Sequence, residues 1–392
     1  VQLRWTFRCY PTEAQAQQLA RTFGCVRFVY NFGLVERTKA FRAGSRMNFA
    51  QSSLALTKLK QTPEHAWLNE VSSVPTQQAL RCLQTAFVNF FDKRAAYPTF
   101  KRKTGTQSAI YTRSAMTFDA GTRNLKLAFL GHLRVKWSRP MGGINPSSVT
   151  VIRKPSGRYF VSMVVDVATP QFAKTGAEVG VDFGITRLAT LSTGERIPNP
   201  KHGQQQQARV AQLQRAVARK RKGSQRRHLA ACRLARAQER VADCRRDTIN
   251  KLARNLVSRF DVIYLEDLNL RGMVKNHALA RTLSDTSIGA SIRTIETKAA
   301  MHGKATVKID RWFPSSKMCS VCGVLQSKMS LGIRRWTCEC GAVHDRDENA
   351  AKNILAVGQT VSAHGGGVRL RRATARRSDR LRSANQPRSA CA

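Results

Sequence analysis

Acidic residues are scarce in this sequence: 24 Asp and Glu stand against 67 Lys and Arg, which leaves a formal net charge of +43. Long apolar runs are also missing, because no stretch approaches the ~20 consecutive apolar residues of a membrane span. The opening residues contain no apolar block followed by a small-residue cleavage site. We therefore expect a soluble, cytoplasmic protein rather than a membrane or secreted one. The large positive charge makes nucleic acid the first hypothesis for its partner.

No internal repeat is visible, and global disorder is not expected, because 392 residues with 42% hydrophobic content suffice for two or three packed domains. The carboxyl-terminal residues differ from the rest. Residues 368–392 contain eight Arg, one Asp and little apolar periodicity. We predict that the chain ends in a disordered basic tail over 366–392.

The amino-terminal half combines strand and helix patterns. Leu3, Trp5 and Phe7 alternate with polar residues, which predicts a strand. Thr12 is expected to cap a helix that ends at Gly24, followed by a second helix, and 11–94 is mainly helical. Short β-type runs separated by turn residues follow. We expect one β-barrel with the helical region inserted between its first two strands.

A second unit begins near Glu178. The run VGVDFGITRLATLSTGE predicts a hairpin that carries Asp182, and FDVIYLE predicts a strand that ends at Glu266. Between them, residues 201–254 form a helical region with 16 Lys or Arg against only three acids, at positions 239, 243 and 247. So few local partners indicate that phosphates neutralise this region. A solvated basic face is the alternative.

Four cysteines lie close together near the carboxyl terminus. They form KMCSVCG and WTCECG, with the ligand positions Cys319, Cys322, Cys338 and Cys340. Two close pairs of thiolates suit tetrahedral zinc, and Gly323 and Gly341 supply the backbone freedom that such turns use. An iron-sulfur centre or unrelated buried thiols are the alternatives. A closed four-thiolate set predicts a structural metal.

Three acids in separate segments form the other candidate site. Asp182 lies within an apolar strand, Glu266 ends another, and Asp347 lies where a helix begins in HDRDENAAKNIL. A lone acid in such a place is usually a cap or an ion-pair partner. Three together accept a desolvation cost that a cation must offset, and Mg²⁺ prefers such oxygen ligands. Two ions of this kind can support phosphodiester hydrolysis.

GVDFGI, VIYLEDL, the cysteine segment and HDRDENAAKNIL, in that order, resemble the RuvC-type nuclease core of TnpB proteins. These are transposon-encoded RNA-guided DNA endonucleases related to type V CRISPR effectors. Upstream, CYPTEAQ, GCVRFVYN, the run from Gln77 to Phe91 and YPTFKRK resemble the amino-terminal half of the same family. The resemblance covers nearly the whole chain as far as AHGGG at 363–367. The C-x-C spacing of the second cysteine pair and the Arg-rich tail depart from the usual pattern.

The resemblance implies an α/β multidomain fold, with an RNase H-like RuvC core, an inserted zinc ribbon and an amino-terminal β-barrel with an inserted helical recognition module. We assign its parts as follows: a wedge-like barrel at 1–10 and 95–175, the recognition module at 11–94, the nuclease core at 176–316 and 341–365 with basic helices at 201–256, the zinc ribbon at 317–340, and the tail at 366–392.

The resemblance also implies roles for individual residues. Asp182, Glu266 and Asp347 match the catalytic acids that bind Mg²⁺ or Mn²⁺, and the family pattern D-x-N-A-A favours Asp347 over Asp345. Adjacent strand residues alternate faces, so Asp267 is expected to point away from the site. The reader of a short DNA motif beside the target is expected at Phe49, Ser73, Gln77, Thr112 and Arg113, and contacts to the nucleic-acid backbone at Arg219, Lys220, Arg221 and Lys222. Phe49 and Gln77 could equally pack or cap helices.

We therefore predict an RNA-guided DNA endonuclease of an insertion-sequence transposon, acting in the prokaryotic cytoplasm as a monomeric ribonucleoprotein with a guide RNA and double-stranded DNA. Three alternatives are less favoured. A guide-dependent repressor would be expected to lose the three acids, and all three are present. A transposase with paired His would need a His-x-His motif, and none occurs in the sequence. A ribosomal-type zinc-ribbon protein would explain the charge and the cysteines but not the acids. A compact type V CRISPR effector stays open, because the guide locus lies outside the chain.

Overall fold

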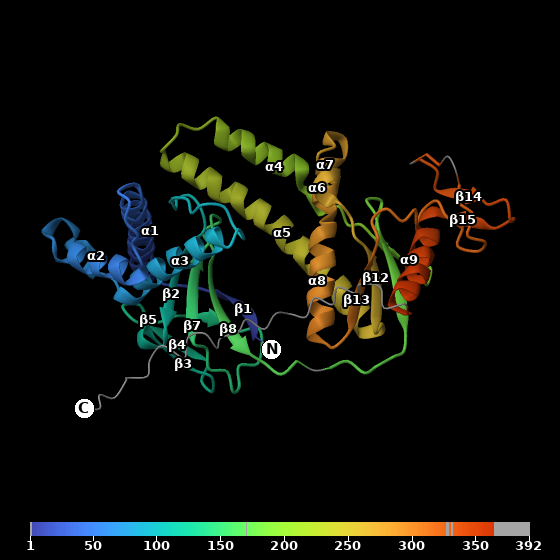
Figure 1. Ribbon diagram of the computed structural model, residues 1–392. Helices are drawn as coiled ribbons and strands as arrows, with labels where there is room; N and C mark the ends of the chain where they lie inside the picture. Colours follow the sequence, from blue (N-terminus) through green and yellow to red (C-terminus); the bar gives the residue numbers. More distant parts are fainter. Residues whose placement is uncertain (1, 170, 327–328, 331, 364–392) are drawn as a thin grey trace, which may run out of the picture. The chain divides into compact units, whose positions relative to one another are not determined.

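The computed structural model describes residues 2–169, 171–326, 329–330 and 332–363, which fall into two compact units (Figure 1). The first unit comprises the chain up to Ala168 together with Ala211–Gln238, and the second comprises Thr169–Val210 and the chain from Glu239 onward. The predicted tail over 366–392 lies outside the described residues. Within the described ranges, no helix combines the length and apolar character needed to cross a membrane.

An antiparallel five-stranded sheet forms the centre of the first unit. The predicted opening strand is β1 (Gln2–Cys9), which pairs along its whole length with β8 (Tyr159–Asp166). The strand order is β2-β7-β8-β1-β6, with β2 at Gln107–Thr112, β7 at Ser148–Arg153 and β6 at Val135–Lys136. A smaller sheet joins β3 (Met116–Asp119), β4 (Asn124–Leu127) and β5 (Gly131–His132), and a short 3₁₀ turn, η2 (Arg113–Ala115), precedes β3.

Three helices and one 3₁₀ turn lie between β1 and β2 in the chain. They are α1 (Glu13–Arg42), α2 (Phe49–Gln61), η1 (Pro63–Asn69) and α3 (Ser73–Phe91). Thr12 caps α1 in a capping box with Gln15, as predicted. The predicted break at Gly24 is wrong, because α1 continues through it. Phe23 and Val26 on either side are buried in the same core, so packing outweighs the modest cost of a helical glycine.

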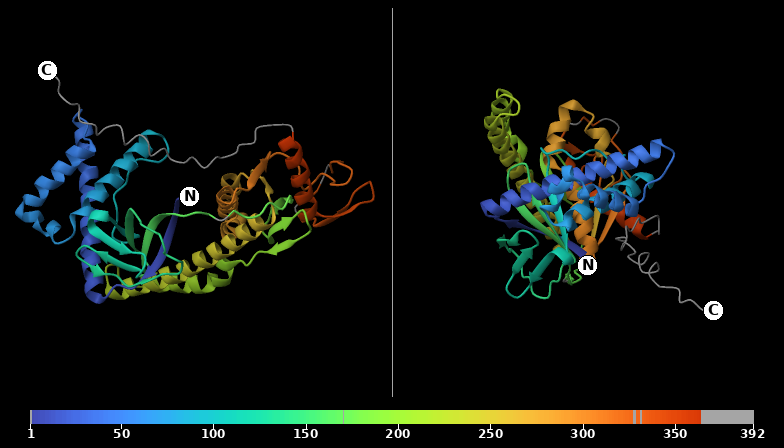
Figure 2. Two further views of the ribbon diagram at one scale, coloured as in Figure 1. Left: turned by 90° about the horizontal axis from the view of Figure 1, so that it is seen from below. Right: turned by 90° about the vertical axis from the view of Figure 1, so that its left-hand side faces the viewer.

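The basic region forms a helical hairpin of α4 (His202–Ala218) and α5 (Gln225–Arg259) (Figure 2). The Arg227 guanidinium donates to the carbonyls of Val217 and Lys220, both at 2.8 Å. These bonds satisfy backbone acceptors where α4 ends. The tip of the hairpin belongs to the first unit and its base to the second.

A mixed five-stranded sheet forms the centre of the second unit. Its order is β11-β10-β9-β12-β13. The predicted hairpin consists of antiparallel β9 (Glu178–Phe183) and β10 (Arg187–Leu191), and β11 (Arg196–Pro198) extends it. On the other side β12 (Val262–Glu266) runs parallel to both β9 and β13 (Ala305–Ile309).

Helices cover both faces of this sheet (Figure 1). On one face, buried side chains of α5 and of α8 (Ile288–Met301), such as Leu256 and Ile295, pack against Val181 and Leu265. On the other face lies α9 (Arg346–Ala363), whose Ile354 packs against Tyr264. Two short helices, α6 (Leu270–Met273) and α7 (His277–Thr286), connect β12 to α8.

Two glycines allow α9 to approach the sheet closely. A Cβ on Gly180 of β9 would lie 2.2 Å from the Ala351 carbonyl oxygen, and a Cβ on Gly358 of α9 would lie 2.0 Å from the Tyr264 ring. Neither distance is sterically possible. Gly180 and Tyr264 therefore identify the sheet face that α9 covers.

Candidate metal centres

Asp182 and Glu266 occupy neighbouring positions on two parallel strands. The pairing of β9 with β12 ends at Val181 and Leu265, and each acid is the next residue on its strand. Side chains of a strand alternate between faces, so Asp182 lies on the face of Gly180 and Glu266 on that of Tyr264. Both carboxylates thus belong to the face that α9 covers.

Asp347 belongs to the same face of the sheet, because it lies in the first turn of α9. Its neighbour Asp345 has a different role: Oδ1 of Asp345 accepts hydrogen bonds from the backbone N–H groups of Asp347 (3.1 Å) and Glu348 (3.2 Å). Asp345 therefore caps α9. Asp347 instead forms ion pairs with Arg334 at 3.4 Å and Arg187 at 3.7 Å.

The electrostatics of Asp182 reflect these neighbours. Burial, followed by the charges of Glu266 and Asp347, raises its pKa to about 8, although nearby arginines oppose the effect. Burial also raises the pKa of Glu266. Carboxylates that are crowded and desolvated in this way favour a proton or a metal cation among them. The oxygen-only donor set suits a divalent cation such as Mg²⁺.

A loop after β13 fixes Glu266. The Ser315 hydroxyl donates to Oε1 of Glu266 at 2.5 Å. The side-chain amide of Asn353, on α9, donates to the backbone carbonyls of Ser315 and Met318, both at 2.7 Å. Asn349 also donates to the Met318 carbonyl at 2.7 Å. The loop therefore ties the helix that carries Asp347 to the strand that carries Glu266.

Asp267 takes no part in this arrangement. Its carboxylate pairs with Arg311, and its side chain is 43% exposed. Glu266 and Asp267 thus contact different partners, in agreement with the alternation of strand residues.

The four cysteines form a compact thiolate set. All four Sγ atoms lie within 4.8 Å of one another. The Cys319–Cys340 separation is 3.8 Å and the Cys322–Cys338 separation is 3.5 Å. A tetrahedron with the 2.3 Å bonds typical of zinc has edges of roughly 3.8 Å, so this set fits a single tetrahedral metal ion.

Local backbone geometry explains how these cysteines converge. Gly323 and Gly341 have φ of 77° and 85°, in the left-handed region that the sequence led us to expect at both turns. A short hairpin of β14 (Arg335–Thr337) and β15 (Val343–Asp345) follows the first pair. Burial opposes ionisation of Cys319, but hydrogen bonds from the N–H groups of Cys322 and Val321, together with those of the His344 and Cys322 side chains, lower its pKa to about 5.

His344 was not anticipated from the sequence. Its Nε2 lies 3.0 Å from Sγ of Cys319, and its ring packs on Trp336 with centroids 4.6 Å apart. A hydrogen bond from an imidazole stabilises a metal-bound thiolate. The only available signal was its place directly before the capping Asp345, four residues after Cys340.

A basic cavity of about 510 Å³ lies beside α9 and the β14–β15 hairpin. Its lining contains five Lys or Arg residues, two acids and three other residues: Arg187, Arg196, Arg334, Arg335, Lys352, Asp345, Glu348, Val343, His344 and Asn349. Arg196 pairs with Asp345 at 3.1 Å. Arg335 forms no ion pair with any described residue. The excess positive charge suits an anionic group such as a phosphate.

The residues expected to read a DNA motif all lie in the first unit. Ser73 and Gln77 are exposed and four residues apart on α3, so they share one side of that helix. Phe49 begins α2, is partly buried, and lies under the Arg81 guanidinium at 5.2 Å. Thr112 ends β2, and the Arg113 guanidinium donates to the Asn145 carbonyl at 3.5 Å.

The four cations proposed for backbone contacts lie in the turn between α4 and α5. Arg219, Arg221 and Lys222 are exposed and Lys220 is partly buried. Within the part of the chain that the structure describes, none of the four forms an ion pair. Their charge is therefore available to a ligand.

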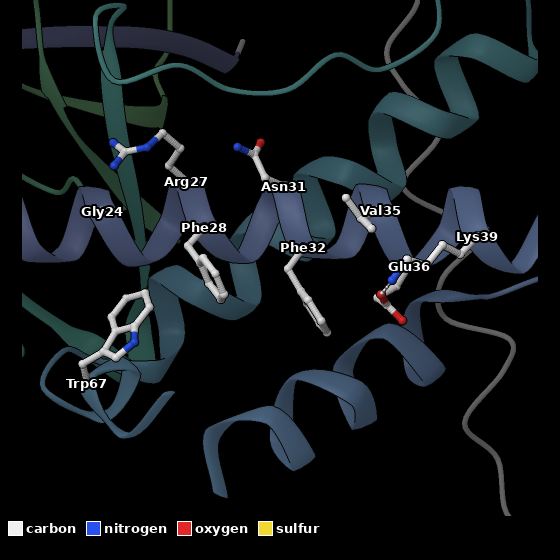
Figure 3. A pocket seen from close by; sticks show the side chains of 9 residues that line it. All are labelled: Gly24, Arg27, Phe28, Asn31, Phe32, Val35, Glu36, Lys39 and Trp67. Carbon is white, nitrogen blue, oxygen red and sulfur yellow. Dashed lines mark hydrogen bonds and ion pairs between the residues drawn. The ribbon is translucent and has the colours of Figure 1, made fainter. Parts of the chain in front are cut away.

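A cavity of about 650 Å³ lies along α1 in the first unit (Figure 3). Phe28, Phe32 and Trp67 contribute its aromatic surface, and the Phe28 and Trp67 ring centroids are 5.1 Å apart. Glu36 is the single acid in the lining. The cavity brings together no set of metal ligands, so we do not assign the hydrolytic chemistry to it.

Three family profiles match separate parts of the chain. The IS605 OrfB profile, described as "Probable transposase", matches residues 161–277, and "Cas12f1-like, TNB domain" matches 289–354. A profile described as "Helix-turn-helix domain" matches 1–46. In this structure, those first residues form β1 and the single long helix α1.

Curated relatives match over nearly the whole chain. A "Putative RNA-guided DNA endonuclease" of Streptomyces pristinaespiralis is 50% identical over 381 residues, covering 96% of this chain and 94% of the relative. InsQ of Escherichia coli K12, which has the same description, is 29% identical and covers 92% and 93%. A solved Cas12f1 in complex with sgRNA and target DNA aligns with a TM-score of 0.55 at 14% identity, over 88% of this chain and 83% of that one. That last likeness concerns the fold alone.

Proposed function

This chain belongs to the TnpB family, and on that premise we propose that it is an RNA-guided DNA endonuclease of an insertion-sequence transposon. One observation carries the proposal: two adjacent parallel strands and the helix that covers them bring Asp182, Glu266 and Asp347 to one sheet face. A protein that only bound guided DNA would have no need for these desolvated carboxylates.

Asp182, Glu266 and Asp347 would hold catalytic Mg²⁺ or Mn²⁺. When bound, such ions activate water and offset negative charge on the phosphodiester. The side chains of this chain prepare the site: the Ser315 hydroxyl orients Glu266, and Arg187 and Arg334 contact Asp347. The raised pKa of Asp182 supports the assignment, because a divalent cation would replace the proton that the crowded carboxylates otherwise favour.

Cys319, Cys322, Cys338 and Cys340 would hold a structural zinc ion. Four sulfur ligands complete a tetrahedron and leave no position for a substrate. The ribbon follows the Ser315 loop and precedes α9 in the chain. We therefore propose that zinc stabilises the segment that connects Glu266 to Asp347.

The parts of the molecule would then have the following roles. We propose that the second unit contains an RNase H-like RuvC core, with the ribbon at 317–340 inserted before α9. In the first unit, the segments 1–10 and 95–175 would form the wedge-like barrel, and α1, α2 and α3 would form the recognition module. Mixed pairing in β11-β10-β9-β12-β13 and helices on both sheet faces support the first assignment.

A guide RNA and target DNA would neutralise the basic surfaces of the protein. Arg219, Lys220, Arg221 and Lys222 would contact phosphates, because no described acid pairs with them. Base pairing would read the target sequence while the protein reads backbone shape and a short flanking motif. We expect one protein chain for each guide RNA, in the cytoplasm of a prokaryote.

Phe49, Ser73, Gln77, Thr112 and Arg113 are proposed to read the flanking motif. The exposed Gln77 amide could bond an adenine edge, and Arg113 could bond guanine or a phosphate. Phe49 is the weakest member of the set, since its ring already packs under Arg81.

RNA that copurifies with the chain provides the first test. We expect one defined RNA species, whose variable end specifies the DNA that the complex cuts in the presence of Mg²⁺. Heterogeneous cellular RNA together with no guided cutting would contradict the proposal. Defined RNA and tight target binding without cutting would instead favour a guide-dependent repressor, and an RNA transcribed from a CRISPR array would identify a compact type V effector.

A further inference from the structure

Trp312 is the most exposed large apolar side chain in the described part of the chain, at 83% of its maximal accessibility. Its indole forms no hydrogen bond and no ring contact with any described residue. Burying a tryptophan removes some 150–250 Å² of surface from water, so an indole left in solvent forgoes a large stabilisation. Single exposed apolar residues are common on protein surfaces, so the surroundings of this indole decide whether it has a role.

The backbone that carries Trp312 is firmly held. On one side, Arg311 pairs with Asp267, and on the other, the Ser315 hydroxyl donates to Glu266 at 2.5 Å. The N–H of Trp312 itself donates to Oδ1 of Asp310 at 3.0 Å. Both flanks of the tryptophan are thus attached to consecutive residues at the end of β12.

Phe313 shows that the loop does not expose every aromatic side chain that it carries. This next side chain packs inward against the core of Tyr264, Val307, Ile309 and Ile354. The same short loop therefore packs one aromatic ring, partly buried, against the core and presents the other to solvent. Since Asn353 of α9 also holds the Ser315 carbonyl, the loop is anchored to the elements that carry both Glu266 and Asp347.

We propose that Trp312 is a stacking subsite for one unpaired nucleobase of the DNA strand that enters the carboxylate site. The proposal rests on the nuclease function proposed above. Every base has a π-face, so stacking on an indole tolerates any sequence, which suits an enzyme whose specificity comes from pairing. In a duplex both faces of a base are covered by its neighbours, so this subsite accepts single-stranded DNA.

Stacking on Trp312 would position the DNA strand for cutting. Trp312 is a positioning residue: a base held on its rigid loop fixes the adjoining phosphodiester relative to Glu266 and Asp182. Stacking of one base typically contributes enough binding energy for a roughly 5- to 150-fold effect. That range sets the expected loss on removal of the ring.

The test is single-turnover cutting of a guided DNA target by the assembled ribonucleoprotein, with Trp312→Ala, Trp312→Tyr and, as the matched control, Phe129→Ala. Phe129 is likewise exposed, at 63%, and lies between β4 and β5. We expect Trp312→Ala to cut roughly 5- to 150-fold more slowly with unchanged guide and target affinity. Trp312→Tyr and Phe129→Ala should stay close to the parent.

An abasic scan of the target identifies the stacked base. For the parent, removing one base near the cut should slow cutting as much as Trp312→Ala does, and the same abasic site should have no further effect on the Trp312→Ala protein. Parental rates for Trp312→Ala, equal losses in the Ala and Tyr variants, or additive effects of variant and abasic site would each overturn the proposal. A parent that cuts no DNA at all would instead refute the nuclease function itself.

Discussion

The carboxylate site and the turn between α4 and α5 carry unbalanced charges of opposite sign. At the sheet face, burial and then the charges of Glu266 and Asp347 raise the pKa of Asp182 to about 8. In the turn, four consecutive cations from Arg219 to Lys222 have no ion-pair partner among the described residues. One region has crowded negative charge and the other has unneutralised positive charge.

The two regions also differ in how firmly they are built. The carboxylates stand on two strands and a helix, and Ser315 and Asn353 hold them in place. The cations stand in an exposed turn on long side chains. A rigid site suits one or two small ions of fixed geometry, whereas an exposed row of cations suits a polyanion. The comparison indicates that a ligand of opposite charge completes each region.

The largest expected effect comes from neutralising one of the carboxylates. Asp182→Asn or Glu266→Gln should abolish guided cutting in Mg²⁺ and leave guide and target binding nearly intact, because these groups would hold metal rather than phosphate. The matched control is Glu296→Gln. Glu296 pairs with Lys308 at 2.7 Å, and Lys308 lies between Val307 and Ile309, so this carboxylate lies on the opposite face of the sheet. Parental cutting by either active-site variant would remove that acid from the centre.

A comparison of Asp345 with Asp347 tests which of these two acids belongs to the metal site. Asn is as good a helix cap as Asp, so Asp345→Asn should retain most of the cutting while Asp347→Asn loses it. Cutting rates and helix content of the two variants decide the matter. The reverse ranking would exchange the roles assigned to these two acids.

Next in size is the loss of a cysteine ligand. Cys340 is exposed, so Cys340→Ser removes a metal ligand without emptying the core. We expect the zinc content to fall well below one ion for each chain and the protein to become less stable, because structural zinc contributes folding free energy. Cys232→Ser, a change of an isolated thiol on α5, serves as the control. Iron in place of zinc, or full zinc occupancy in Cys340→Ser, would contradict the assignment.

The pH dependence tests the crowding of the acids without measuring cutting. The folded pKa of Asp182, about 8, lies above its ordinary value of 3.8, so the folded protein retains a proton that the unfolded chain releases. Stability without added Mg²⁺ should therefore fall as pH rises between these two values. Asp182→Asn should flatten the dependence, and Mg²⁺ should bind the parent about tenfold more weakly for each pH unit below 8.

Thermal unfolding and magnesium titrations across this pH range provide the measurement. Parallel stability profiles for the parent and Asp182→Asn would show that the three carboxylates do not crowd one another.

The turn between α4 and α5 should give a smaller, graded effect. Changing Arg219, Lys220, Arg221 and Lys222 together to Gln should weaken nucleic-acid binding and reduce the salt slope by up to about 3 units. The control changes four cations that already have acidic partners, namely Arg21, Arg94, Arg246 and Lys251. Equal salt slopes for the two quadruple variants would identify the turn as an ordinary solvated surface.

The smallest expected effect concerns the flanking motif. Gln77→Ala should change the preference at one motif position, since a lost base contact costs ~1–3 kcal/mol while backbone contacts persist. Gln78→Ala removes the neighbouring amide, which points to another side of α3. A cutting assay on randomised flanking sequences compares them. An identical motif for the parent and Gln77→Ala would exclude this residue as a reader.

Local patterns in the sequence were sufficient to predict the strands and the helix that carry the three carboxylates. Apolar strands containing Asp182 and Glu266 and a helix starting near Asp347 predicted the elements correctly, because each depends on nearby residues. Gly24 shows the limit of such reasoning. A glycine after a polar run resembles a helix end, yet the buried side chains on both sides keep α1 continuous.

Contacts across long stretches of sequence were beyond prediction. Ser315 reaches Glu266 over 49 residues, and Asn353 reaches the Ser315 carbonyl over 38. Neither pairing leaves a periodic signal, since each depends on how β12, β13 and α9 pack. His344 and Trp312 escaped notice for the same reason: the role of each follows from its neighbours in space.

Reprogramming the guide tests the central claim most directly. The parent and Asp182→Asn are loaded with the same RNA, whose guide segment is exchanged for a second sequence, and both are offered two DNA targets with the same flanking motif. We predict that the parent cuts only the target that matches its current guide, and that Asp182→Asn binds that target without cutting it. Cutting that ignores the guide, or cutting by Asp182→Asn at the parental rate, would contradict the account.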